Sequence, residues 1–124
     1  MTQKSHNILK SDNAQIVLDS IEVIWNRGEF DRIPEFYTED FVSHQGGYSL
    51  WKLTWDPGRD GLHRFVSKLR EEFPDYHESP EVVFSEQDFV IVRQTISGTT
   101  RGTGVFPTSN QKMSVKDMMI CRLK

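Results

Sequence analysis

The stretch Phe73-Pro74-Asp75-Tyr76 marks the change from a helical pattern to a strand pattern in this 124-residue chain. Before it, residues 60–73 carry apolar side chains at three- and four-residue spacing, which is typical of an amphipathic helix. Pro74 ends that pattern because proline disfavours a helical backbone in the residue before it. After it, alternating apolar and polar residues predict antiparallel strands. Helices first and strands later indicate an α+β fold.

The remaining elements follow from the same two periodicities. Besides the helix over 60–73, we predict a helix over 13–26, a helical turn over 31–36, a short strand over 41–44, strands over 76–86, 89–97 and 113–123, and the start of another strand over 99–106. Pro80 indicates a bulge or an edge position in the first long strand. We expect residues 1–10 to form a loose arm and residues 45–58 to form a loop rich in aromatic side chains.

Composition narrows the class of protein. Hydrophobic residues make up 36% and charged residues 27%, so we expect one folded domain over residues 1–124. Lysine and arginine form no cluster, which argues against nucleic-acid binding, and the apolar runs are too short to span a membrane. A polar N-terminus without a signal peptide and a single cysteine, Cys121, predict a cytoplasmic protein. Histidines and acids lack metal-site spacing, and we expect no cofactor.

The last strand pattern places an acid among apolar residues. Strict alternation puts Asp117 between Val115 and Met119 on one face. A carboxylate on a mostly apolar face is costly unless it is paired, hydrated or functional. Three interpretations remain open: Asp117 is a functional acid, or its face of the strand is half-exposed, or Asp117 pairs with a neighbouring arginine such as Arg93.

Several motifs carry a family resemblance through their order along the chain. They are Asp40-Phe41-Val42-Ser43-His44, a helix opened by Asp60-Gly61, Phe73-Pro74-Asp75-Tyr76, Ser97-Gly98-Thr99-Thr100-Arg101-Gly102 and Phe106-Pro107-Thr108. In this order they resemble the SnoaL-like polyketide cyclase (ester cyclase) family of the nuclear transport factor 2-like superfamily. The resemblance implies helices packed on a curved antiparallel sheet that forms a cone with a pocket. It also implies a homodimer formed through the sheet face.

The resemblance further implies candidate site residues. Asp117 becomes the candidate base, and His44, near the expected pocket mouth, or a tyrosine becomes the candidate proton donor. A histidine that is simply hydrogen-bonded at a strand end is the alternative for His44. The expected substrate-binding residues are Trp25, Tyr37, Tyr48, Trp51, Trp55, Arg93 and Met119. Core packing is the alternative for Trp25 and Tyr37, and a lid or a dimer contact is the expectation for Trp51 and Trp55.

The resemblance stops at the last predicted strand. Family members continue through an Asp-Gly turn into a strand that carries an acid proposed as the general acid/base, and Lys124 falls where that turn would begin. The final family strand therefore has no counterpart in residues 1–124. We expect either that the natural chain continues or that the strand edges pair with a partner chain.

Three functions fit these patterns. The first is cofactor-free acid/base chemistry of the polyketide-cyclase type in a hydrophobic pocket, such as an intramolecular aldol closure or a related isomerisation or hydrolysis. Its substrate would be an apolar or aromatic small molecule. The second is a non-catalytic small-molecule-binding module, which is favoured by Met119 and Thr100 at positions where relatives often carry histidine. The third is a structural dimer whose own side chains fill the pocket.

Overall fold

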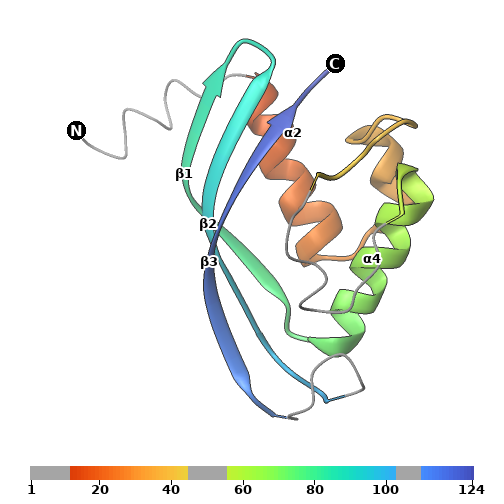
Figure 1. The fold of residues 1–124 in the computed structure, drawn as a ribbon, viewed down its shortest axis with the longest axis vertical. Coiled ribbons are helices and arrows are strands. Elements are labelled where there is room, and N and C mark those ends of the chain that lie inside the picture. Colours follow the sequence, from red (N-terminus) through yellow and green to blue (C-terminus); the bar gives the residue numbers. More distant parts are fainter. Residues whose placement is uncertain (1–11, 45–55, 103–109) are drawn as a thin grey trace.

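The structure is a computed structural model that describes residues 12–44, 56–102 and 110–124. Its helices are α2 (Asp12–Ser20), the π-helical turn η1 (Ile21–Asn26), the 3-10 helix η2 (Phe30–Glu35) and α4 (Gly58–Glu72). The strands β1 (His77–Glu86), β2 (Phe89–Thr99) and β3 (Lys112–Arg122) follow. They form one antiparallel sheet in the order β1-β2-β3, which curves beside the helices (Figure 1). The predicted α+β fold is confirmed.

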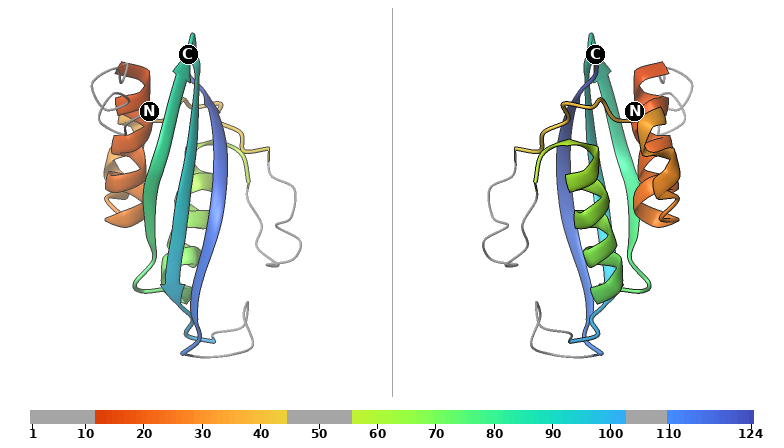
Figure 2. Two further views of the ribbon diagram at one scale, coloured as in Figure 1. Left: turned by 90° about the vertical axis from the view of Figure 1, so that its left-hand side faces the viewer. Right: turned by 90° about the vertical axis from the view of Figure 1, so that its right-hand side faces the viewer.

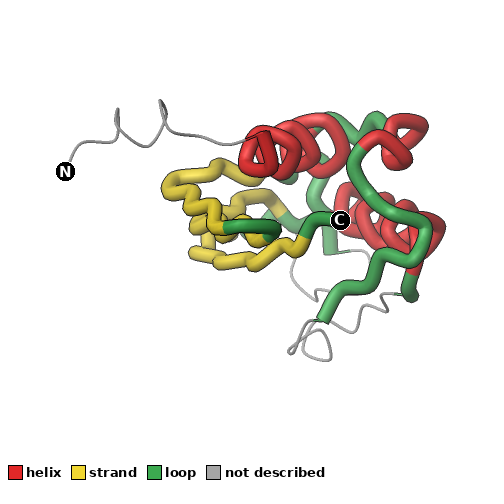
Figure 3. The backbone as a smooth tube through the Cα atoms, turned by 90° about the horizontal axis from the view of Figure 1, so that it is seen from above, coloured by secondary structure: helices red, strands yellow, loops and turns green. Residues whose placement is uncertain are grey.

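The helices lie on one side of the sheet (Figures 2 and 3). Two apolar clusters join the layers. The first connects α2 and η1 to the sheet through Ala14, Val17, Ile21, Val90 and Val92. The second connects η1, η2 and α4 to the start of β1 through Val23, Ile24, Ile33, Leu62, Phe65, Val66, Leu69, Phe73 and Tyr76. Both clusters lie between the helices and the sheet, so the helix-covered face is its inner face.

The cross-strand register fixes which side chains share that inner face. Four rows run across β1, β2 and β3: Glu78–Ile96–Val115, Pro80–Gln94–Asp117, Val83–Val92–Met119 and Ser85–Val90–Cys121. The register between β1 and β2 shifts between Pro80 and Val82, which confirms the predicted irregularity. This shift reverses the alternation of β1, so that both Glu78 and Val83 face inward although they lie five positions apart in the sequence.

Three predicted local structures differ from those observed. Residues 41–44 form no strand, because the carbonyl of Phe41 accepts a hydrogen bond from the backbone N–H of Gly58 instead of joining a ladder. Residues 100–102 form no strand either, since the backbone N–H groups of Arg101 and Gly102 bond to Glu72. The helix predicted over 13–26 widens into the π-helical turn η1, where Arg27 N–H bonds to Glu22 O. Residues 1–10, 45–55 and 103–106, with the expectations that concern them, lie outside the described residues.

Candidate active site

Four polar side chains meet on the inner face of the sheet. The amide nitrogen of Gln94 donates to Oε1 of Glu78 at 3.0 Å and to Oδ2 of Asp117 at 3.1 Å. The hydroxyl of Tyr76 donates to Oε2 of Glu78. The cluster therefore joins two carboxyl groups through one amide. Glu78, Gln94 and Asp117 come from β1, β2 and β3, and Tyr76 lies just before β1. We call Tyr76, Glu78, Gln94 and Asp117 the carboxylate cluster.

The carboxylate cluster lies between the two apolar clusters. Along β2, Gln94 is flanked on its own face by Val92 of one cluster and by Ile96, which packs against the other. Glu78 is 3% exposed and Gln94 is 0% exposed, whereas Asp117 is half-buried on β3. One carboxyl group is therefore enclosed and the other remains in contact with solvent.

Burial controls the proton affinity of Glu78. Removing its carboxylate from water disfavours the charged form and raises the pKa of Glu78 to about 7, against the opposing hydrogen bonds from Tyr76 and Gln94. The negative charge of Asp117 adds to the increase. Glu78 thus exchanges its proton near neutral pH, which is the property that general acid/base chemistry requires.

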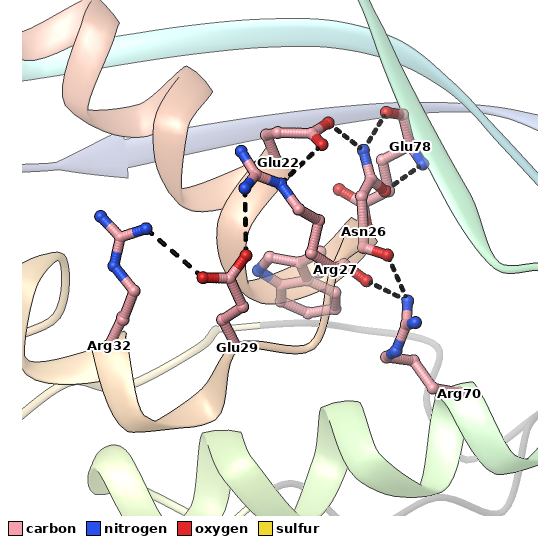
Figure 4. Close-up of polar contacts among 8 residues, drawn as sticks. Glu22, Asn26, Arg27, Glu29, Arg32, Arg70 and Glu78 are labelled. Atoms are coloured by element: carbon pink, nitrogen blue, oxygen red, sulfur yellow. Dashed lines mark hydrogen bonds and ion pairs between the residues drawn. The ribbon is translucent and has the colours of Figure 1, made fainter.

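The end of η1 holds Glu78 in place (Figure 4). The Asn26 side chain accepts from the backbone N–H of Glu78 at 2.8 Å and donates to its carbonyl at 2.9 Å, much as a neighbouring strand would. Arg70 of α4 donates to the carbonyls of Trp25 and Asn26 at 2.8 and 2.7 Å. Helix α4, η1 and β1 are therefore tied together at the point where Glu78 enters the cluster.

Aromatic side chains surround the enclosed end of the cluster. The indole N–H of Trp25 donates to the hydroxyl of Tyr37 at 3.0 Å, and the Trp25 ring lies 6.5 Å from the ring of Tyr76 between centroids. Burial of its hydroxyl raises the pKa of Tyr37 to about 12, so Tyr37 stays neutral. Tyr76 also lines a small apolar hollow of about 30 Å³ together with Leu69, Phe73, Ile96, Ser97, Gly98, Met113 and Val115.

Only some of the site residues predicted from the sequence lie at the carboxylate cluster. Asp117 belongs to the carboxylate cluster, Trp25 and Tyr37 lie beside it, and Met119 occupies the next inward position on β3. Arg93 is exposed on the outer face of the sheet, where its cross-strand partner is Met118. Asp117 is the cross-strand partner of the next residue, Gln94, and successive residues of a strand face opposite sides of the sheet. The suggested pairing of Arg93 with Asp117 is therefore wrong.

The other nominated residues lie away from the cluster or outside the described structure. His44 is exposed, and the contacts that define the cluster do not include it. Tyr48, Trp51 and Trp55 lie outside the described residues. The catalytic role of His44 and the binding roles of these rings therefore stay predictions.

Sequence reasoning missed Glu78, Gln94 and Tyr76. Gln94 carries no charge, so nothing in the sequence distinguishes it from the other polar residues of its strand. Glu78 was hidden by the register shift after Pro80, which a simple alternation cannot detect. Pro80 was the one feature of the sequence that could have revealed Glu78. A bulge at Pro80 reverses the face of the residues before it relative to the residues after it.

Fold and site together define a small α+β protein whose curved sheet carries a carboxyl pair on its helix-covered face. The chain belongs to the SnoaL-like polyketide cyclase family, whose model matches residues 15–124. No curated protein matches the sequence.

Solved structures share the fold. TsrD from Streptomyces laurentii is 16% identical, with 94% of this chain and 82% of that chain covered and a TM-score of 0.77. A SnoaL-like polyketide cyclase from Agrobacterium tumefaciens is 17% identical, with 93% and 84% covered and a TM-score of 0.72. An NTF2-like protein of unknown function from Burkholderia pseudomallei is 18% identical, with 93% and 83% covered and a TM-score of 0.74. In the described part of the chain, no helix has both the length and the apolar character needed to cross a membrane.

Proposed function

We propose that this protein catalyses proton transfer at carbon on an apolar carbonyl compound, without a cofactor, in chemistry of the polyketide-cyclase type. The observation that carries this proposal is the Gln94 amide, which bridges Glu78 and Asp117 at 3.0 and 3.1 Å on the inner face of the sheet. Two carboxyl groups in different environments provide an acid and a base in one site. The family membership supports the same class of reaction.

The two carboxyl groups have separate roles in this proposal. Half-buried Asp117 takes the proton when a C–H bond next to the substrate carbonyl breaks. The electron pair of that bond moves onto the carbonyl oxygen and forms an enolate. Glu78 has a pKa of about 7 and therefore still carries its proton at slightly acidic to neutral pH. It supplies this proton to the enolate oxygen, or to the oxygen of the second carbonyl that is attacked in an aldol closure. This assignment replaces His44 with Glu78 as the preferred donor.

Exchange of carbon-bound protons with deuterium tests the proposal without knowledge of the natural substrate. The probe is 1-tetralone in D2O, as the first of a panel of apolar ring ketones, and proton NMR follows the loss of the signal next to the carbonyl. We expect the protein to accelerate this exchange over buffer, and we expect Asp117→Asn to lower the acceleration by about 100-fold or more, as for loss of a general base. Asp88→Asn, on the exposed turn before β2, is the matched control.

Two results would count against catalysis. If no ketone of the panel exchanges faster than in buffer while the ketones bind, the protein is a binding module of the same fold. If Asp117→Asn exchanges as fast as the wild type, Asp117 is not the base. We also expect the exchange rate to fall as the pH rises past about 7, because Glu78 then loses its proton.

A further inference from the structure

The side-chain oxygen of Gln94 is a buried acceptor that has no hydrogen-bond partner among the described residues. Gln94 is 0% exposed, so this oxygen is also shielded from solvent. Buried polar atoms are normally paired, because an unpaired one loses its hydrogen bonds to water without replacement. An acceptor left in this state within a candidate active site is therefore a candidate contact for a ligand.

The amide of Gln94 cannot satisfy its oxygen by turning over. Its nitrogen donates to both Glu78 and Asp117, and carboxylate oxygens accept hydrogen bonds. Turning the amide would place Oε1 against the carboxylate of Asp117, which repels it, and would remove the hydrogen bonds that Glu78 and Asp117 now accept. Asp117 therefore fixes the orientation of Gln94 and leaves Oε1 as an unpaired acceptor.

The surroundings define what reaches this oxygen. Asp117 lies directly opposite Gln94 on β3 and is half-buried, so the cluster is accessible on the β3 side. On the same face Gln94 is flanked by Val92, which is fully buried in one apolar cluster, and by half-buried Ile96, which packs against the other. A ligand that enters beside Asp117 would therefore find one unpaired acceptor next to the apolar side chain of Ile96.

We propose that the ligand of the inner face is an apolar compound that carries a hydroxyl group, and that this hydroxyl donates its hydrogen bond to Oε1 of Gln94. Gln94 is then a specificity-determining residue. In a planar amide, the oxygen and one N–H share an edge, so a hydroxyl at Oε1 lies next to one of the two carboxyl groups. The inference rests on the proposed function in placing the ligand beside Asp117, but it concerns recognition and not proton transfer.

Binding of three matched compounds tests this inference. The probes are 6-hydroxy-1-tetralone, 6-methoxy-1-tetralone, which keeps the oxygen but lacks the donor, and 1-tetralone, with dissociation constants from NMR titration near neutral pH. We expect the wild type to bind the hydroxy compound about tenfold more tightly than the other two, since a site built to accept a hydroxyl rejects analogues that lack it. In Gln94→Met we expect the three affinities to agree within about twofold, because the acceptor is gone. Gln15→Met, the same change on the exposed face of α2, should keep the tenfold preference.

The outcomes separate the two proposals. Equal affinity of the wild type for all three compounds, or a hydroxyl preference that survives in Gln94→Met, overturns the inference, whatever the exchange assay shows. A clear hydroxyl preference without any deuterium exchange supports the inference and contradicts the proposed catalysis. If Gln94→Met does not fold, the side-chain amide signal of Gln94 in the wild type decides: it must shift with the hydroxy compound, and an equal shift with the methoxy compound overturns the inference.

Discussion

At the scale of single residues, Glu78 determines how the protein responds to pH. Its pKa is about 7 in the folded protein, against an ordinary value of 4.5, chiefly because the carboxylate is removed from water. Between these two values the folded state binds more protons than the unfolded state, so stability falls as the pH rises through this window. The loss reaches about 3 kcal/mol above pH 7.

Glu78→Gln should remove this pH dependence, because the amide keeps the shape of the side chain without a charge. We expect urea denaturation to show the wild type less stable at about pH 8 than at about pH 5, and the variant to have a much smaller difference. Glu81→Gln is the matched control, since Glu81 is exposed on the same strand and its salt bridge with Lys116 lowers the pKa of that carboxyl. A wild type equally stable at both pH values would contradict the role assigned to Glu78.

Residue patterns predicted one half of the carboxyl pair and missed the other for a physical reason. Asp117 was found because β3 is regular, so a two-residue period assigned its face correctly. In β1, counting back from inward Val83 by twos places Glu78 on the outer face, yet the shift between Pro80 and Val82 turns it inward. The bridge through Gln94 depends on the register of three strands, which no local pattern contains.

At the scale of elements, the joint between η1 and β1 depends on one side chain. Asn26 satisfies both backbone groups of Glu78 on the side of β1 that faces away from β2, and it also donates to Glu22 at 3.2 Å. The helices were predictable from apolar spacing, but this joint was not, because it pairs residues that lie 52 positions apart. Packing of the whole domain, rather than local propensity, brings them together.

Asn26→Ala should therefore destabilise the protein by about 1 to 3 kcal/mol, the cost of leaving partly buried backbone groups without partners. Asn13→Ala is the matched control: Asn13 makes one exposed hydrogen bond to the carbonyl of Gln87, and its loss should cost about 0.5 kcal/mol or less. Thermal or urea unfolding measures both. Equal effects of the two substitutions would mean that the side-chain clamp on β1 does not stabilise the site.

At the scale of the whole molecule, the face of the sheet that points away from the helices carries apolar side chains. Phe84, Met118 and Ile120 are 52%, 65% and 66% exposed, and Phe84, Ile91 and Ile120 form one row across the three strands. Contiguous exposed apolar surface of this kind is typical of a protein interface. The homodimer expected from the sequence resemblance would cover this face, with the carboxylate cluster on the opposite, helix-covered side.

The double variant Met118→Lys/Ile120→Lys tests that arrangement, because two charges in the centre of an apolar interface lose their water on association. We expect sedimentation to show a wild-type dimer and a monomeric variant with unchanged ketone exchange, since Asp117 and Glu78 lie on the other face of the sheet. Val42→Lys, at an exposed apolar position outside the sheet, should stay dimeric. A double variant that remains dimeric would move the interface to a strand edge, where β1 and β3 each have one side without a paired strand among the described residues. A wild type that is monomeric at all concentrations tested would contradict the prediction that this apolar face forms a homodimer.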